Sequence, residues 1–198
     1  MSALVPAIHA WPTNGDLIAD VAKLYDFGES VLDATYGRGR FWIKYRPPAL
    51  VTNDLDPDAE ADNHYDFRRL PWPNQSFDTV VFDPPYKLSG TPALGDFDDR
   101  YGLSRPQRWQ DRMEMIADGA WECARVAKNL LLVKCQDQVV AGKVRWQTLT
   151  VIEAVAPVME LVDRFDMLGG SRPQPGNRPQ RHARGRGSTL LVFRRRRP

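Results

Sequence analysis

The chain has 198 residues, of which 42% are hydrophobic and 26% are charged, and these values are typical of a single globular domain with its own core. No apolar run approaches the ~20 residues that a membrane span needs, and the first residues lack the basic and apolar regions of a secretory signal. We therefore expect one domain over residues 1–198, no membrane association and a cytoplasmic location. The two cysteines, Cys123 and Cys135, are too few for a disulfide framework or a zinc site, so no metal is expected.

The net charge of +2 conceals an uneven distribution along the chain. Residues 171–198 contain nine arginines and no acid, which leaves 18 basic and 25 acidic residues in residues 1–170. A polyanion would be attracted to the carboxyl end. The alternative is a solvated arginine-rich tail that only improves solubility.

Hydrophobic periodicity predicts alternating strands and helices. In chain order we expect a helix over 15–27 capped by Asn14, strands over 31–34, 49–53 and 77–82, a helix over 106–129, a strand over 129–134, a helix over 144–155, and strands over 159–165 and 188–193. This order predicts an α/β fold with a twisted, mostly parallel sheet and helices on both faces. The last two strands, with no helix between them, should form an antiparallel pair at the edge.

The most informative segment is Asp83-Pro84-Pro85-Tyr86, which follows an apolar, β-branched strand. Neither proline can donate to a sheet ladder, so the chain must leave the strand in a stiff turn. Open α/β sheets bind their ligands at this carboxyl end of the strands. A carboxylate, a rigid carbonyl and an aromatic ring together suit a planar base with an exocyclic amine. A tight turn with a surface tyrosine is the alternative.

A second turn, Asp33 to Gly39, follows the first predicted strand and contains Thr35, Gly37 and Gly39. Glycine permits positive φ and close approach of a ligand to the backbone. Trp42 stands where a dinucleotide fingerprint needs a small residue, which argues against an NAD or FAD oxidoreductase, and no P-loop lysine follows. Taken alone, the turn could be purely structural.

Two acids complete the pattern. Asp54 ends the next strand, at about the distance where a carboxylate meets ribose hydroxyls in nucleotide-binding folds, and Asp66 precedes the strand that leads to Asp83. A glycine turn, two acids and a proline turn in order along one sheet form a more specific pattern than any of them alone.

On these motifs, residues 31–86 resemble the class I S-adenosylmethionine-dependent methyltransferases, and more narrowly the amino-methyltransferases that modify exocyclic amines of DNA or RNA bases. The resemblance implies a Rossmann-like fold, S-adenosylmethionine as cofactor and Asp83, Pro84, Pro85 and Tyr86 as the catalytic motif. It implies a cofactor site formed by Asp33, Thr35, Gly37 and Gly39, with Asp54 (less favourably Asp56) at the ribose, Asp66 and Phe67 at the adenine, and Pro12 and Thr13 at the methionine end.

The chemistry agrees with this resemblance. An aromatic amine is a poor nucleophile because its lone pair is delocalised into the ring. If Asp83 and the Pro84 carbonyl each accept one amine hydrogen, the lone pair localises and the carboxylate stabilises the charge that develops on nitrogen. Tyr86 would stack on the base.

The resemblance favours adenine in DNA, because aspartate in the first motif position is commoner for adenine than for cytosine. Cytosine in DNA and a base in rRNA or tRNA remain alternatives, as does an inactive nucleic-acid-binding module with this fold. Only about 44 residues separate Gly39 from Asp83, too few for an inserted recognition domain.

Substrate contacts are therefore expected from two irregular segments. The loop 87–105 would act through Phe97, Arg100 and Tyr101, and the basic segment 169–187 through Arg172, Arg178, Arg181, Arg184 and Arg186. Lys134 and Cys135 end a strand on the same side, and we expect them to be structural. The oligomeric state is left open.

Overall fold

The computed structural model describes residues 4–88, 108–169, 182 and 187–197. Its elements are β1 (Ile8–His9), α1 (Asn14–Leu24), β2 (Ser30–Asp33), η1 (Arg40–Trp42), β3 (Ala49–Thr52), β4 (Phe77–Phe82), α3 (Trp109–Val126), β5 (Ala127–Cys135), β6 (Gln138–Val140), β7 (Lys143–Arg145), α4 (Gln147–Val155), β8 (Met159–Met167) and β9 (Ser188–Arg195). Among the helices in this part of the chain, none has the length and apolar character needed to cross a membrane.

A seven-stranded sheet in the order β1-β8-β9-β5-β4-β2-β3 forms the centre of the molecule. The pairs β2–β3, β2–β4 and β4–β5 are parallel, whereas β9 runs antiparallel to both β5 and β8. The predicted mostly parallel α/β sheet with a terminal antiparallel pair is thus confirmed. Beyond that pair, β1 adds a short parallel strand to β8, so the pair is not the outermost part of the sheet.

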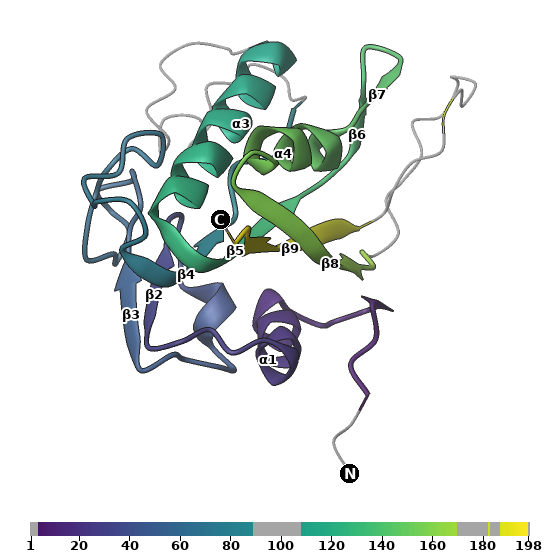
Figure 1. Cartoon of the computed structure of the whole chain (residues 1–198). Helices are drawn as coiled ribbons and strands as arrows, with labels where there is room; N and C mark the ends of the chain where they lie inside the picture. Colours follow the sequence, from purple (N-terminus) through teal and green to yellow (C-terminus); the bar gives the residue numbers. More distant parts are fainter. Residues whose placement is uncertain (1–3, 89–107, 170–181, 183–186, 198) are drawn as a thin grey trace.

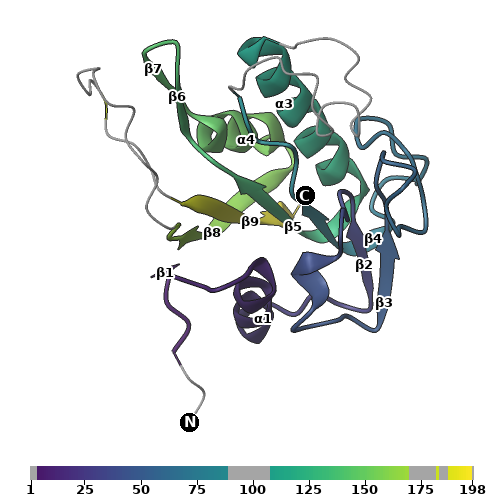
Figure 2. The same cartoon turned by 180° about the vertical axis from the view of Figure 1, so that it is seen from behind.

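Helices cover both faces of this sheet, as Figures 1 and 2 show from opposite sides. The helix α1 and the short helix η1 lie on one face, and α3 and α4 lie on the other. We refer to these faces as the α1 face and the α3 face. In α1, the apolar side chains of Leu17, Ile18 and Val21 are buried, which is the helical spacing that the sequence predicts.

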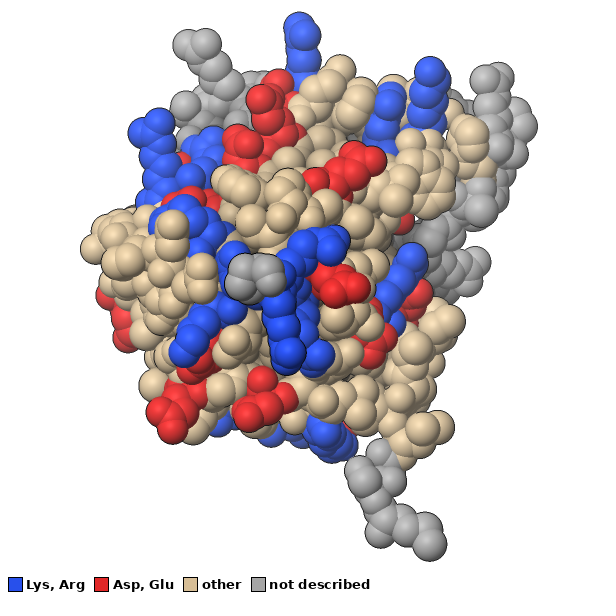
Figure 3. All heavy atoms as spheres, in the orientation of Figure 1, with Lys and Arg blue, Asp and Glu red and all other residues tan. Residues whose placement is uncertain are grey.

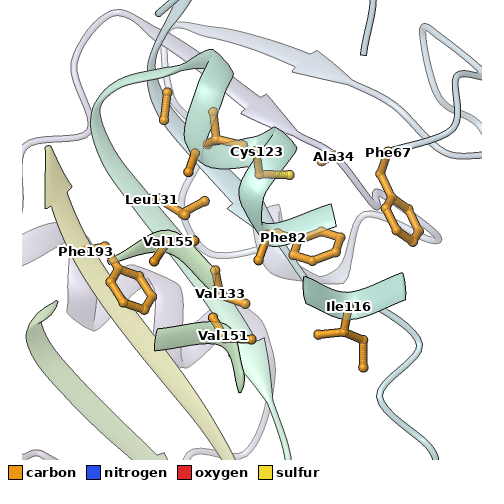
Figure 4. Close-up of a cluster of buried hydrophobic side chains, with 14 of the residues drawn as sticks. Ala34, Phe67, Phe82, Ile116, Cys123, Leu131, Val133, Val151, Val155 and Phe193 are labelled. Atoms are coloured by element: carbon orange, nitrogen blue, oxygen red, sulfur yellow. The ribbon is translucent and has the colours of Figure 1, made fainter. Parts of the chain in front are cut away.

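Two apolar clusters, one on each face, hold the layers together. On the α3 face, Phe82 of β4 and Val133 of β5 pack with Ile116 and Val151 from the helices (Figure 4). Residues of the same strands that point the other way belong to the α1 cluster, Val81 on β4 and Leu130 and Leu132 on β5 among them. This alternation with a period of two determines which strand-end residues meet on a given face.

Several predicted boundaries are wrong. The cap of α1 is Thr13, whose side chain accepts from the Asp16 amide, rather than Asn14, which is the first helical residue. The predicted helix 144–155 begins at Gln147, because the residues before it form the second strand of a hairpin, β6–β7. Neither this hairpin nor β1 was predicted from the sequence.

Candidate functional site

Three charged side chains meet on the α1 face at the carboxyl ends of neighbouring strands. Asp33 ends β2, Asp83 follows β4 and Lys134 lies near the end of β5. Because Val31, Val81 and Leu132 belong to the α1 cluster, the residues two positions further on, Asp33, Asp83 and Lys134, point to the same face. Parallel pairing of β2, β4 and β5 aligns these ends side by side.

The glycine turn after β2 is held by a hydrogen bond from its backbone to the side chain of Asp54, which follows β3. The Gly37 amide donates to Asp54 Oδ2 at 2.7 Å, and the Asp56 amide donates to Asp54 Oδ1 at 2.9 Å. Gly37 and Gly39 have φ of 56° and 63°, which L side chains rarely adopt. A Cβ on Gly39 would meet the Tyr36 hydroxyl at 2.5 Å, whereas one on Gly37 would point into open space. The predicted ribose acid, Asp54, therefore also fixes the conformation of this turn.

Thr35 connects the glycine turn to the proline turn. Its amide donates to Asp33 Oδ1 at 3.0 Å, and its hydroxyl accepts from the Asp83 amide at 2.8 Å. Two segments that the sequence predicts as cofactor-binding and catalytic are thus held together by one side chain.

Asp83 carries a carboxylate oxygen without a partner. Its Oδ1 is buried and has no hydrogen bond to any described residue, although the residue as a whole is partly exposed. Burial raises the pKa of Asp83 to about 6, and the charge of Lys134 acts in the opposite direction. Buried polar atoms are almost always paired, so an orphaned acceptor in a cleft indicates a place where a ligand donates.

Asp33 has a partner that sequence reasoning missed. The Trp42 indole N–H donates to Asp33 Oδ2 at 2.6 Å, and both residues are buried. Burial raises the pKa of Asp33 to about 7, against the hydrogen bonds from Trp42 and Thr35, and Asp83 and Asp54 add to the rise by repulsion. The tryptophan that departs from a dinucleotide fingerprint thus serves to anchor the first acid of the turn.

Lys134 was expected to be structural, but it lies beside Asp83. Only 3% of the residue is exposed, its ammonium donates to Asn14 Oδ1 at the start of α1, and it lies 5.6 Å from the centre of the Phe41 ring. Burial lowers its pKa, and Asp83 opposes that change. The signal that could have identified Lys134 is its alternation with Leu130 and Leu132, which places a charge on the apolar α1 face.

The backbone after the proline turn is fixed by two glutamines. Pro84 and Pro85 are buried. The Tyr86 carbonyl accepts from Gln138 Nε2 and from Gln147 Nε2, both at 2.6 Å. Gln147 is fully buried at the start of α4, so this bond ties the end of the motif to the α3 face.

A cleft of about 790 Å³ opens at these strand ends. Its acids are Asp33, Asp54, Asp56, Asp58, Glu60 and Asp83, its two cations are Arg38 and Arg40, and Asn14, Thr35 and Gly37 also line it. The volume is within the range of small-molecule and cofactor sites. Four of the nine predicted cofactor residues, Asp33, Thr35, Gly37 and Asp54, therefore share one cavity with Asp83.

The remaining predicted cofactor residues lie elsewhere. Thr13 caps α1 through Asp16, and Pro12 precedes it on the surface. The Phe67 ring is buried on the α3 face against Phe82, with ring centres 5.1 Å apart. The structure thus gives Thr13 and the Phe67 ring structural contacts, and their proximity to a cofactor stays a prediction.

Asp66 lines a second, smaller hollow of about 490 Å³ with Arg68, Arg69 and Trp121. Its carboxylate forms a two-pronged bond with the Arg68 guanidinium, with the shortest contact at 2.6 Å. Neither Asp83 nor the glycine turn borders this hollow. We therefore take the larger cleft as the candidate site.

The predicted substrate-contacting side chains lie outside the described residues. These are Phe97, Arg100, Tyr101, Arg172, Arg178, Arg181, Arg184 and Arg186. Of the four described arginines at the carboxyl end, 194–197, Arg195 donates to carbonyls at the end of α3 and Arg196 donates to the Ala156 and Met159 carbonyls. Over the described ranges, no group of three or more His, Cys, Asp or Glu side chains could hold a metal.

No family model matches the chain, and no curated protein sequence matches it. Solved structures do match. TrmN from Thermus thermophilus aligns with a TM-score of 0.55 and 14% identity over 91% of this chain, which spans only 48% of TrmN. N-methyltransferase NodS from Bradyrhizobium japonicum, in complex with S-adenosyl-L-homocysteine, aligns with a TM-score of 0.57 and 13% identity over 91% of this chain and 85% of NodS.

The [4+2]-cyclase SpnF also matches, with a TM-score of 0.54 and 15% identity over 91% of this chain and 80% of SpnF. At these identities the comparisons show the fold, which is the Rossmann-like fold of class I methyltransferases. Since a cyclase shares it, the fold alone does not establish the reaction, which depends on the residues of the site.

Proposed function

We propose that this protein is an S-adenosylmethionine-dependent methyltransferase that acts on the exocyclic amine of a nucleic-acid base, most favourably adenine in DNA. The observation that carries this proposal is the buried Oδ1 of Asp83, which has no partner among the described residues and belongs to a residue that lines the cleft. An acceptor in that position suits a donor on the substrate, and an amine hydrogen is such a donor.

The residues of the cleft fit the cofactor. Asp54 and Asp56 can accept from ribose hydroxyls, and the acid-rich lining suits a cation. The open space beside the Gly37 Cα leaves room for a ligand against the backbone. When bound, S-adenosylmethionine would supply an electrophilic methyl group on a positively charged sulfur. NodS, which shares the fold, is described as an N-methyltransferase in complex with the demethylated form of this cofactor.

The chain's own residues would then prepare the amine. Asp83 Oδ1 accepts one amine hydrogen and the Pro84 carbonyl the other, which draws the nitrogen lone pair out of the ring. Since positive charge grows on nitrogen as it takes the methyl group, the ionised Asp83 stabilises the transition state more than the bound substrate. Buried prolines and the bonds on the Tyr86 carbonyl keep the acceptors from relaxing, so their orientation costs little during the reaction.

An inactive binding module is disfavoured by the electrostatics of the same group. An ionised carboxylate without a partner destabilises the folded state, and a module that only binds has no use for it. The choice of adenine over cytosine, and of DNA over RNA, depends on the resemblance of Asp83-Pro84-Pro85-Tyr86 to the amino-methyltransferase motif.

The test is incubation with tritiated S-adenosylmethionine and separate DNA and RNA pools, followed by digestion and nucleoside analysis. We expect label in N6-methyl-2′-deoxyadenosine from DNA. Asp83→Ala should lower transfer by about 100-fold or more, as loss of a preorganised transition-state contact does. Its cofactor affinity, measured by calorimetry, should stay within about threefold of wild type, since binding depends on the glycine turn and Asp54.

Glu153→Ala, which removes an exposed acid of α4, is the matched control and should leave transfer unchanged. Full activity of Asp83→Ala would refute the proposed role of this carboxylate. Absence of label in both polymers from the wild-type protein would refute the proposed function.

A further inference from the structure

The hairpin β6–β7 and the first turn of α3 surround the backbone that follows the proline turn. The hairpin projects from the end of β5 beside α4 and the start of α3, at the top of the molecule in Figure 1. Its two central residues, Ala141 and Gly142, both have positive φ, 51° and 73°, which is the conformation of a tight two-residue turn. No residue of this hairpin is among those that line the cleft, although Gln138 supports the turn that carries Asp83.

Three hydrogen bonds tie these elements to the catalytic turn, and a fourth contact joins the hairpin to α3. Gln138, the first residue of β6, donates to the Tyr86 carbonyl and accepts from the Leu88 amide at 3.2 Å. Arg112 of α3 donates to the Lys87 carbonyl at 2.9 Å. The Arg145 guanidinium of β7 lies 3.6 Å from the centre of the Trp109 ring at the start of α3. The hairpin and the helix are therefore held at fixed positions around residues 86–88.

The elements so joined present a set of cations, which we call the basic rim: Lys87, Arg108, Arg112, Lys143 and Arg145. Lys87, Arg108 and Lys143 are exposed, and the other two are half-buried. Within the part of the chain that the structure describes, no ion pair involves Lys87, Lys143 or Arg145. Figure 3 shows basic side chains standing out from the top of the molecule over the hairpin and the start of α3.

Nearby acids are partly occupied by the fold. Asp111 accepts from the Arg108 amide at the start of α3, and Asp137 accepts from the amide and hydroxyl of Thr148 at the start of α4. Glu114 is exposed on the next turn of α3. Among the described residues, the rim thus carries more positive than negative charge, in contrast to the acid-rich cleft. Next to it, Trp146 exposes 52% of its surface, which is unusual for a side chain of this size.

We propose that the basic rim binds the phosphate backbone of the nucleic acid whose base enters the cleft at Asp83. The inference rests on the proposed function and assigns the polymer contact to a surface on the hairpin and α3. Lysine and arginine contacts to phosphates position a polymer without reading its sequence, which fits the absence of an inserted recognition domain between Gly39 and Asp83. Gln138 joins the hairpin to the Tyr86 carbonyl. A nucleic-acid backbone bound at the basic rim would therefore lie at a fixed position relative to the acceptors on Asp83 and Pro84.

The test compares two double variants with the same change in net charge. Lys87→Ser with Lys143→Ser removes two exposed cations of the rim. Lys44→Ser with Lys128→Ser removes two exposed cations elsewhere, after η1 and at the start of β5. Binding of a fluorescent oligonucleotide is measured from 50 to 300 mM salt for each, together with transfer to a free nucleoside.

We expect the slope of log K against log salt to become less steep by about 0.7 to 0.9 for each rim lysine that contacts a phosphate, and to stay unchanged in the control. Transfer to the nucleoside should be unchanged in both. Equal slopes for the rim variant and wild type, or equal losses in both double variants, would overturn the inference. If the wild-type protein binds nucleic acid through the rim but methylates none, the proposed function is refuted and the phosphate-binding role of the rim is retained.

Discussion

Removing the Lys134 ammonium should change the pH dependence of the proposed reaction in a direction that the structure fixes. We consider Lys134→Met, which keeps the length and burial of the side chain beside Phe41 but removes its charge. In the wild-type protein the pKa of Asp83 is raised to about 6 by burial, and Lys134 holds it from rising further. Losing a nearby opposite charge raises a carboxyl pKa by about 1 to 3 units, so we take about 7 as the smallest expected value.

These values give a specific pattern of rates, because only ionised Asp83 can stabilise charge on the amine. At pH 6 the ionised fraction falls from about one half to about one tenth, so the rate should fall about fivefold. For a pKa of about 7, Asp83 is almost fully ionised at pH 8.5 in both proteins, so the difference in rate should shrink steadily as the pH rises. Without Lys134 the neutral form of Asp83 becomes more stable, so the acidic limb of the pH–rate profile moves to higher pH.

The assay is kcat/KM for methyl transfer between pH 5.5 and 9, which reports groups that titrate before the substrate binds. A carboxyl-carbon NMR titration of Asp83 provides a readout that needs no turnover. Lys134→Arg keeps the charge and should restore most of the profile, and Lys128→Met, at the exposed start of the same strand, should not move it. A loss that is the same at every pH would show that Lys134 acts only by packing, and the electrostatic reasoning would be refuted.

Two further predictions concern the stability of the two buried acids. Asp83→Asn should raise the free energy of unfolding relative to wild type, by an amount near zero at pH 4 and about 2 to 3 kcal/mol above pH 7. The reason is that the wild-type protein loses stability as Asp83 ionises through its raised pKa of about 6. Urea unfolding at both pH values measures this, and a difference independent of pH would contradict it. Trp42→Phe removes the donor to Asp33 and should lower the free energy of unfolding by about 1.5 to 3 kcal/mol. The loss should be larger at pH 8.5 than at pH 6, because the pKa of Asp33 is about 7 and the hydrogen bond from Trp42 stabilises the ionised carboxylate. An equal loss at both pH values would indicate lost ring packing alone.

The sequence predicts the parallel strands and the long helix well, because each carries a strong local signal. The run 77–82 is mostly apolar and β-branched and is followed by Asp83 and two prolines, and it forms β4 with the same limits. The helix expected over 106–129 forms α3 over Trp109–Val126, since its apolar residues recur at helical spacing.

The hairpin β6–β7 was not predictable in the same way. Its strands are three residues each, too short for an alternating pattern to emerge, and its turn is Ala141-Gly142 rather than the favoured Asn-Gly. The apolar spacing of α4 extends backwards through Val144, so the predicted helix absorbed the second strand.

At the site, sequence reasoning identifies residues that share a motif but not those that long-range packing adds. Asp33, Thr35, Gly37, Asp54 and Asp83 line one cleft, because they follow successive strands of one sheet. The bond of Lys134 to Asn14 joins residues 120 positions apart. Such a pairing depends on how α1 docks against the sheet, which no local pattern specifies.

The separation of charge explains how a chain of this size could handle two ligands of opposite sign. The acids of the cleft favour a cationic cofactor and repel phosphates, whereas the basic rim does the reverse. On the proposed function, the polymer backbone is therefore confined to the rim, and only an uncharged base can approach Asp83. Reaching it requires that the base leave its stack, since a phosphate chain carried into the cleft would face several carboxylates at once. Asp83 is the one acid of the cleft with a lysine from the adjacent strand opposing the rise in its pKa, so its charge is available where the amine would be.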